Sequence, residues 1–352
     1  MITRIEIDGF KSFVDFELEF KPFTVLAGAN NSGKSNLLDA IALVEAANVE
    51  GLQAFTRWRP DGRSRGGRLF HAAADGARRD SFRVKVQTER RLVEMEVSTG
   101  EHGFEMSTHV AGDPKNAAAD FDQIMVAKPP AALLETRALD PTPREMRLGA
   151  DIYDNSPLVR SGENLAAVVG RILESETFPD FRIDASYVLG ELTDVRAVRD
   201  ERRRVWDLEL EMRGGRVFTP SEVSDGTLRV LCLLAAVHDP LGSGTLLVEE
   251  IENGLDPRYL GRLVAQLVKR SQQVGKVQVI ATTHSPVIVA EAKRISPESV
   301  YLFGIASGPR EYDGERKLDY FTHARSVVPG GERGTFVPSI ELSRYLTPVD
   351  ES

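Results

Sequence analysis

The chain has little of what indicates a secreted or membrane-bound protein. Its 352 residues include a single cysteine, so no internal disulfide can form and a reducing compartment fits. Its longest apolar run, from Val230 to Val237, is far shorter than the roughly 20 residues that a membrane helix needs. The first residues carry charges where a secretory signal needs an unbroken apolar stretch. We therefore expect a cytoplasmic protein without a membrane segment.

The chain also has no excess of positive charge. The chain has 44 Lys and Arg against 53 Asp and Glu, which gives a formal net charge of −9. A surface of this sign does not attract nucleic acid as a whole, so any such contact needs a local basic patch. One arginine-rich loop offers a candidate, since it also contains Trp58 for base stacking. Its arginines are Arg57, Arg59, Arg63, Arg65 and Arg68. A solvated loop without a partner explains the same residues, and both interpretations stay open.

Periodic patterns are clear near the two ends of the chain and weak in its middle. The alternation in Phe16–Phe20 predicts a strand that forms a hairpin with the first residues. The apolar run Phe23–Ala27 predicts a buried strand, and an amphipathic helix follows it. A second antiparallel pair is predicted at 82–89 and 92–98. Residues 111–160 contain six prolines and predict little regular structure.

From residue 221 the chain alternates between helices and buried strands. Thr245–Val248 and Val277–Ala281 have the composition of buried strands, and a helix is expected before each of them. Asp256 and Pro257 form an N-cap followed by proline at the first helical position. Strands that alternate with helices imply a parallel sheet.

The segment from Gly28 to Ser35 fits the phosphate-loop pattern G-x-x-x-x-G-K-[ST]. It lies between the predicted buried strand and the amphipathic helix, which is the context that the motif requires. The two glycines allow the tight turn that directs backbone amides at phosphates, and Lys34 would reach the β- and γ-phosphates. Ser35 would bind Mg²⁺. The expected nucleotide-binding residues here are Gly28, Ala29, Asn30, Asn31, Ser32, Gly33, Lys34, Ser35 and Asn36.

Two carboxylates follow the buried strand at 245–248. Residues at the carboxyl end of a parallel strand face the ligand crevice, and neighbours on a strand point to opposite sides. We therefore assign the two side chains different roles. Glu249 would hold the Mg²⁺ shell, and Glu250 would polarise the attacking water.

Two further segments are ambiguous when taken alone. Ser224, Asp225 and Gly226 precede a helix and would form an anion site there, but an ordinary N-cap explains them equally. His284 follows the last buried strand, where a single histidine is more often structural. The order of the segments favours the functional interpretation, because phosphate loop, Ser-Asp-Gly, Glu-Glu, Leu-Asp-Pro and histidine form the full series of an ABC-type ATPase.

With that series in place, the chain resembles the RecF/SMC-like predicted ATPases of the AAA_21 family. The resemblance rests on Phe10–Phe13, Gly28–Asn36, Ser224–Arg229 and Glu249–Pro257. It is specific over residues 1–45 and 220–290 and vague between them. It implies a P-loop NTPase of ABC type, with a mixed or parallel central sheet, helices on both faces and an antiparallel β lobe. The expected parts are a lobe at about 1–110, an insertion at 111–220, a catalytic segment at 221–300 and a C-terminal extension at 301–352.

The resemblance also implies a mechanism. Two copies would sandwich two ATP molecules as a homodimer, with Ser224–Gly226 of one copy capping the γ-phosphate held by the other. Asp256 would lie at the subunit boundary, and His284 would contact the γ-phosphate and the attacking water. Glutamate replaces the family's more usual aspartate at 249, and Ser-Asp-Gly replaces the transporter signature Leu-Ser-Gly-Gly-Gln, which argues against a transporter subunit. The family's γ-phosphate glutamine could be Gln87 or Gln123.

Several functions fit this pattern. The chain could act directly on DNA in recombination or repair, or it could be the ATPase subunit of a separately encoded effector such as an anti-phage nuclease. A nuclease with its own TOPRIM domain is disfavoured, because the 68 residues after His284 contain no clear Asp-x-Asp pair. A non-hydrolysing scaffold is disfavoured because Glu250 is present.

Overall fold

A computed structural model of the chain describes residues 1–50, 66–100, 103–112, 133–273, 277–312, 314–328 and 335–347. The chain divides into two compact units. The first comprises residues 1–136 and 300–339, and the second comprises 137–299 and 340–352. Each unit is described by itself.

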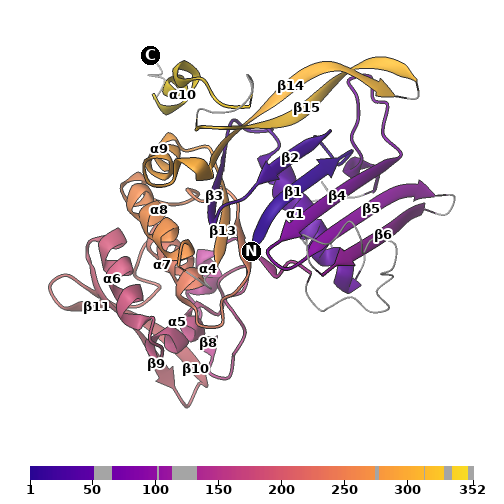
Figure 1. The fold of residues 1–352 in the computed structure, drawn as a ribbon. Coiled ribbons are helices and arrows are strands. Elements are labelled where there is room, and N and C mark those ends of the chain that lie inside the picture. The colour runs from indigo at the N-terminus through magenta and orange to yellow at the C-terminus, as the bar shows by residue number, and fades with distance from the viewer. Residues whose placement is uncertain are drawn as a thin grey trace. The chain divides into compact units, whose positions relative to one another are not determined.

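The first unit contains an antiparallel sheet with the strand order β2-β1-β4-β5-β6 (Figure 1). Its strands are β1 (Ile2–Asp8), β2 (Phe16–Glu19), β4 (Ser81–Thr88), β5 (Leu92–Gly100) and β6 (Gly103–Ala111). Both predicted antiparallel pairs are confirmed, since β1 pairs with β2 and β4 pairs with β5. Along β4, the buried side chains alternate with more exposed ones, because one face of the sheet is covered and the other is not.

A second group of strands in this unit holds the phosphate loop. The fully buried strand β3 (Phe23–Ala27) leads through the loop into α1 (Lys34–Glu50), as predicted. The long hairpin of β14 (Val300–Tyr312) and β15 (Glu315–Ser326) returns to this unit from the far end of the chain, and β14 pairs in parallel with β3. No strand was predicted for this hairpin from the sequence. A short 3-10 helix, η1 (Gly66–Leu69), also belongs to this unit.

The second unit combines helices with two groups of strands. β12 (Thr245–Val248) and β13 (Gln278–Thr283) form a parallel pair, as the alternation of strands and helices predicts, and β7 (Thr136–Leu139) lies beside β12. The other strands, which form a separate sheet, are β8 (Ala150–Asp151), β9 (Leu192–Asp200), β10 (Val205–Met212) and β11 (Arg216–Phe218). The helices are α4 (Pro143–Met146), α5 (Leu165–Leu173), α6 (Phe178–Leu189), α7 (Asp225–His238), α8 (Pro257–Ser271), α9 (Pro286–Ile295), η2 (Pro297–Ser299) and α10 (Ser339–Leu346).

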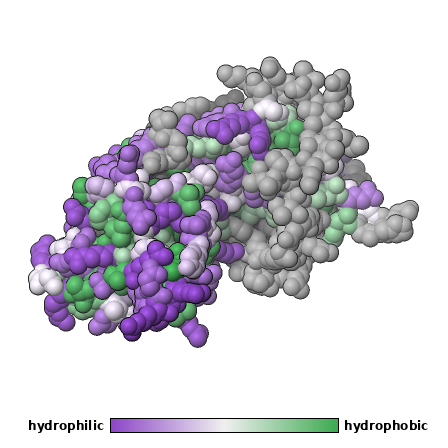
Figure 2. Space-filling model, turned by 90° about the horizontal axis from the view of Figure 1, so that it is seen from below, coloured by the Kyte–Doolittle hydropathy of each residue, from purple (hydrophilic) through white to green (hydrophobic). Residues whose placement is uncertain are grey.

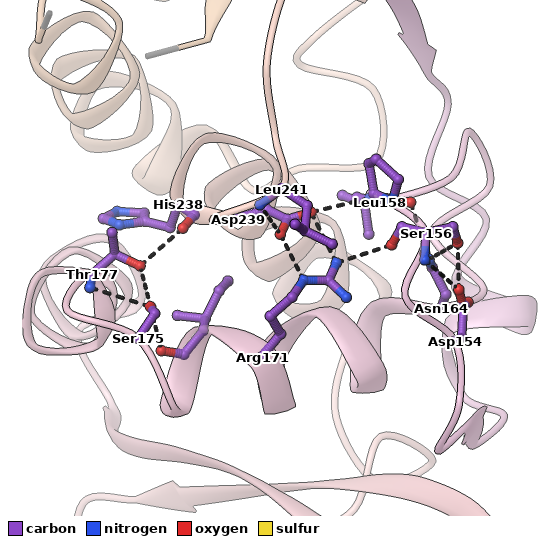
Figure 3. Close-up of polar contacts among 12 residues, drawn as sticks. Asp154, Ser156, Leu158, Asn164, Arg171, Ser175, Thr177, His238, Asp239 and Leu241 are labelled. Atoms are coloured by element: carbon purple, nitrogen blue, oxygen red, sulfur yellow. Dashed lines mark hydrogen bonds and ion pairs between the residues drawn. The ribbon is translucent and has the colours of Figure 1, made fainter. Parts of the chain in front are cut away.

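The buried end of α7 is fixed by polar contacts (Figure 3). The carboxylate of Asp239, which follows α7, is fully buried and accepts two hydrogen bonds from the guanidinium of Arg171 on α5, at 2.9 and 3.1 Å. The hydroxyl of Thr177 donates to the carbonyl of His238 at 2.9 Å. A buried ion pair is stable only when its geometry and further hydrogen bonds offset desolvation, and these contacts supply both. They hold the C-terminal end of α7 in place.

The surface shown in Figure 2 is mostly hydrophilic, with apolar residues in separate small patches. Ile183 and Tyr187 on α6 are among the exposed apolar side chains, which are common on protein surfaces. Among the described residues, no helix is both long enough and apolar enough to cross a membrane.

Candidate functional site

The phosphate loop requires glycine at both glycine positions of its motif. Gly28 has φ +148° and Gly33 has φ +97°, values that side chains rarely tolerate. A Cβ atom at Gly28 would lie 2.5 Å from the carbonyl oxygen of Phe303 on β14, and one at Gly33 would overlap the hydroxyl of Thr322 on β15. The β14–β15 hairpin therefore packs directly on the loop, and its close approach explains the two glycines.

The polar groups of the loop are arranged for an anion. The Nζ atom of Lys34 donates to the carbonyls of Gly28 and Ala29, both at 2.7 Å, so the buried lysine curls over the loop. The hydroxyl of Ser32 is buried and has no hydrogen-bond partner among the described residues. A buried hydroxyl without a partner costs about 1–3 kcal/mol, which a bound anion would offset. Because α1 begins at Lys34, its first amides add the positive end of the helix dipole.

A cavity of about 520 Å³ lies beside this loop within the first unit. The predicted residues Ser35 and Asn36 line it, while the other loop residues Ala29, Asn30 and Asn31 are exposed. The rest of its lining contains the aromatic and basic side chains of Phe70, His71, Tyr320, Lys11, Arg68 and Arg78, together with Ser12, Asp39 and Ala72. Such a lining suits a planar ring joined to an anionic group. Of the arginine loop, Arg68 lies in η1 and lines this cavity. The other four arginines, Arg57, Arg59, Arg63 and Arg65, lie outside the described residues.

In the second unit, β12 ends at two carboxylates that differ in exposure. Glu249 is half-buried and Glu250 is exposed. Glu250 has φ +44°, an uncommon conformation for a residue other than glycine, and its N–H donates to the hydroxyl of Thr282 on β13 at 2.8 Å. A residue held in such a conformation points to a functional position, because its strain is retained only where neighbours enforce it. The turn after β12 thus presents the Glu250 carboxylate to solvent.

His284 is held by a residue that sequence reasoning missed. One carboxylate oxygen of Glu252 accepts from the backbone N–H of His284 at 2.6 Å and lies 3.0 Å from its Nδ1. The other oxygen is buried without a hydrogen-bond partner in the described part of the chain. Because a carboxylate accepts the Nδ1 proton, the arrangement leaves Nε2 as the ring atom available to a ligand. Glu252 is therefore a positioning residue for His284.

Replacing Glu252 with glutamine tests this role. We expect ATP turnover to fall by about 10- to 100-fold with little change in KM, because the His284 ring loses a charge-assisted contact. Steady-state phosphate release at several ATP concentrations measures both constants. Glu291→Gln is the control, since it breaks an ion pair with Arg294 on α9. Unchanged turnover in Glu252→Gln would show that His284 needs no such anchor.

The Ser-Asp-Gly segment forms an N-cap that further contacts orient. The Ser224 hydroxyl accepts from the N–H of Thr227 at 3.1 Å. Asp225 is paired at 2.6 Å with Arg147, which also donates to the carbonyl of Val223. The sequence offered no signal for Arg147, whose partner lies 78 positions away. The prediction that Ser224 caps the helix is thus correct. It does not exclude an anion site, because the first backbone amides of α7 lie at the same end of the helix.

The same structure brings the segment against Asp256. A Cβ atom on Gly226 would lie 3.1 Å from the carbonyl of Gly254, in the loop that leads to Asp256. Asp256 caps α8 as predicted, and its carboxylate accepts from the backbone and side chain of Arg258. These hydrogen bonds from Arg258 lower the pKa of Asp256 to about 2 and keep it ionised.

The predicted residues therefore form two groups, one in each unit. The first unit contains the phosphate loop and its cavity, and the second contains Glu249, Glu250, Asp256, His284 and the segment Ser224–Gly226. Gln87 lies on β4 opposite Leu92 of β5, and Gln123 lies outside the described residues. Within the described ranges, no three His, Cys, Asp or Glu side chains gather as a metal site. Mg²⁺ typically uses one or two protein ligands together with phosphate oxygens, so its binding needs no such cluster.

Comparison with known proteins matches two segments of the chain. A family model described as "AAA ATPase domain" (AAA_15) matches residues 1–78, and one described as "AAA domain, putative AbiEii toxin, Type IV TA system" (AAA_21) matches residues 179–290. A short segment is 49% identical over 45 residues to the structural maintenance of chromosomes protein 1 of Arabidopsis thaliana. That segment is 12% of this chain and 4% of the relative, so this chain spans only a small part of it.

Solved structures match over nearly the whole chain. An SmcHead bound to the C-winged helix domain of ScpA is 18% identical, with a TM-score of 0.57, and the match covers 91% of this chain and 97% of that one. The SMC head domain of Thermotoga maritima is 17% identical, with a TM-score of 0.52 and coverages of 90% and 97%. An Smc head from Pyrococcus furiosus, bound to the C-terminal domain of ScpA, is 16% identical, with a TM-score of 0.55 and coverages of 93% and 96%.

At these identities the solved structures establish the fold, which is that of an ABC-type ATPase head with parallel and antiparallel sheets. The family matches add a sequence relationship over the two segments that contain the phosphate loop and the acidic strand. In these segments and in its fold, the chain is similar to the SMC- and RecF-related ABC-type ATPases.

Proposed function

We propose that the protein binds ATP with Mg²⁺ and hydrolyses it to ADP and phosphate. The observation that carries this proposal is the phosphate loop, with Lys34 curled over it, a buried Ser32 hydroxyl without a partner, and an aromatic and basic cavity beside it. ATP consists of a planar ring system joined to a phosphate chain, so its binding needs a cavity for the ring next to a loop for the phosphates. The fold and the two family matches support the same function.

The residues present suit a magnesium nucleotide. The loop supplies the anion site, and Ser35 at the first turn of α1 lines the cavity with its hydroxyl available as a ligand. We propose Ser35 and Glu249 as the protein ligands of Mg²⁺. When bound, Mg²⁺ neutralises charge on the phosphates and makes the terminal phosphate more susceptible to attack.

For hydrolysis, we assign the carboxylate of Glu250 to the attacking water. It would accept the proton of that water while its backbone is held by Thr282. His284, oriented by Glu252, would donate from Nε2 to the terminal phosphate in its protonated form. Asp256 remains ionised at neutral pH, which suits a charged contact at a subunit boundary.

We further propose that ATP joins two copies of the chain. Ser224–Gly226 lies at an exposed helix start, with Gly226 against the loop that leads to Asp256. Such a surface can accept a phosphate presented by another molecule. Hydrolysis would then separate the copies, which gives a cycle of association and release.

Titration calorimetry with ATP and a phosphate-release assay test the central proposal. We expect ATP binding to be strongest with Mg²⁺, and turnover to stop when EDTA removes the metal and to resume when Mg²⁺ is restored. Binding that ignores Mg²⁺ would contradict the assigned ligands. A protein that shows no ATP binding under either condition would refute the proposed function.

For its partner we favour a separately encoded protein effector over DNA. The net charge of −9 disfavours a broad DNA surface, and two similar head structures were solved with a bound ScpA domain. Purification with tagged protein and ATP should recover a stoichiometric protein. ATPase activity that DNA stimulates, with no protein recovered, would instead favour direct action on DNA.

A further inference from the structure

Tyr320 is an aromatic residue at the wall of the cavity beside the phosphate loop. It lies on β15, in the long hairpin that returns to this unit from the far end of the chain (Figure 1). Its exposed fraction is 51%, so much of the residue is available for contact with another molecule. Leu318, two residues earlier on the same strand, has a similar exposure of 53% but is outside the cavity lining that the described residues form. Exposed apolar side chains are common on protein surfaces, so what distinguishes Tyr320 is its place in the cavity.

Thr322, two residues further along β15, joins this strand to the phosphate loop. Its hydroxyl donates to the carbonyl of Ser32 at 3.1 Å, and its backbone N–H donates to the carbonyl of Ser12 at 2.7 Å. The pairing of β15 with β14 has no register shift, and side chains two positions apart on a strand point to the same face. Tyr320 therefore lies on the same face of β15 as Thr322, about 7 Å further along the strand. The strand runs from the phosphate loop to the Tyr320 ring.

Buried contacts of the preceding residue hold this part of β15 in place. One carboxylate oxygen of Asp319 lies 2.8 Å from Nε2 of His71, and the other accepts from the hydroxyl of Tyr312 at 2.8 Å. Neighbouring residues on a strand point to opposite faces, so these contacts fix the backbone at 319 while the Tyr320 ring projects to the other face. A ring on an anchored strand loses less conformational freedom when a ligand contacts it than a ring on a mobile loop.

The cavity contains both an end for phosphates and an aromatic wall. Ser35 of the phosphate loop and Tyr320 line the same cavity, whose volume of about 520 Å³ lies within the range of roughly 300–1,000 Å³ that is usual for small-molecule sites. A nucleotide whose terminal phosphates lie on the loop extends its base away from the loop. Every nucleobase has a flat π-face that stacks on an aromatic ring. One nucleotide in this cavity can therefore place its phosphates at the loop and its base on Tyr320.

We propose that the ring of Tyr320 stacks on the base of the bound nucleotide, so that the protein binds a nucleoside triphosphate more tightly than the same phosphate chain without a base. The inference rests on the proposed ATP-binding function and deepens it, because it assigns the base to a residue of the C-terminal hairpin. Tyr320 contacts the substrate but not the phosphates that react, so its role is in binding and selection of the substrate.

The test compares the affinity for Mg·ATP with that for magnesium tripolyphosphate, which has the phosphate chain but no base. Titration calorimetry measures both ligands with the wild type, Tyr320→Phe and Tyr320→Leu. We expect Tyr320→Leu to bind ATP about 5- to 100-fold more weakly, which is the usual contribution of stacking on one base, and to bind tripolyphosphate as the wild type does. Tyr320→Phe keeps the ring and should bind both ligands as the wild type does.

Leu318→Ala is the matched control, and Tyr320→Trp reports the contact directly. Leu318 lies on the same face of the same strand with a similar exposure, so its truncation should leave the affinity for both ligands unchanged. A tryptophan at position 320 should bind ATP at least as tightly as the wild type. Its fluorescence, measured as the difference from the wild type, should fall when ATP is added, because a stacked base quenches indole emission. Tripolyphosphate should produce no such fall.

The outcomes distinguish this inference from the proposed function. If Tyr320→Leu binds ATP as the wild type does, or weakens the binding of ATP and tripolyphosphate equally, the ring does not hold the base and the inference is wrong. Fluorescence of Tyr320→Trp that ATP leaves unchanged, or that tripolyphosphate lowers to the same extent, would overturn it even if Tyr320→Leu folds poorly. In each of these cases, ATP binding by the wild type still supports the proposed function. A wild type that binds no ATP would instead refute the proposed function itself.

Discussion

Replacing Lys34 with alanine is expected to lower ATP affinity by about 100-fold or more and to reduce turnover to background. The Nζ atom of Lys34 supplies the one side-chain cation that the loop residues Gly28–Ser35 contribute. It also donates to the carbonyls of Gly28 and Ala29, so its loss both removes a charge that faces the phosphates and releases the loop. Titration calorimetry with Mg·ATP and a phosphate-release assay measure the two effects.

Lys85→Ala is the matched control for this variant. Lys85 lies on β4 of the same unit and forms only a partly exposed ion pair with Glu6 at 3.6 Å, so its removal should leave affinity and turnover unchanged. If Lys34→Ala binds and hydrolyses ATP as the wild type does, the phosphate-loop assignment is wrong.

The second large effect is expected from Glu250→Gln, which should bind Mg·ATP and hydrolyse it about 10²- to 10⁴-fold more slowly. Glutamine keeps the shape of the side chain and removes the group that accepts the water's proton. The N–H of residue 250 still donates to Thr282, so the turn after β12 should persist. Held before hydrolysis, the variant should accumulate as an ATP-dependent dimer, or as a more closed form of an existing dimer. Light scattering with and without ATP measures this.

Ser224→Arg added to Glu250→Gln should abolish that association. The arginine would occupy the position where the Ser-Asp-Gly segment meets the partner's γ-phosphate. The substitution also removes the cap on Thr227, which costs about 1 kcal/mol of stability. Ser224→Ala in the same background loses the same cap but adds no bulky side chain. Thermal unfolding of the two variants therefore distinguishes a loss of stability from a blocked association between the two copies. If the copies still associate with Ser224→Arg present, Ser224–Gly226 does not contact the γ-phosphate held by the other copy. If Glu250→Gln hydrolyses ATP normally, Glu250 is not the catalytic residue.

Local pattern was enough to predict several elements. Strands β2 and β4 have buried residues at every second position, and the buried strands β3 and β12 are short apolar runs, whereas β1 has no clean alternation. The β14–β15 hairpin escaped prediction because Gly304, Gly308 and Pro309 interrupt its alternation. Its strands are stabilised by pairing with each other and by the parallel contact of β14 with β3, in which Val300 pairs with Val25.

The sequence by itself determined the phosphate loop, the acidic strand and the helix caps, because each is a short-range pattern whose chemistry is complete within a few residues. Only the tertiary structure decided which side chains hold these groups in place. Glu252 meets His284, Arg147 meets Asp225, and His71 meets Asp319, across 32, 78 and 248 positions respectively. Such pairs follow no local period, since residues far apart in the sequence become partners only when folding brings their segments together. Of the three pairs, His71 and Asp319 are almost fully buried, where an unpaired polar group is too costly to persist.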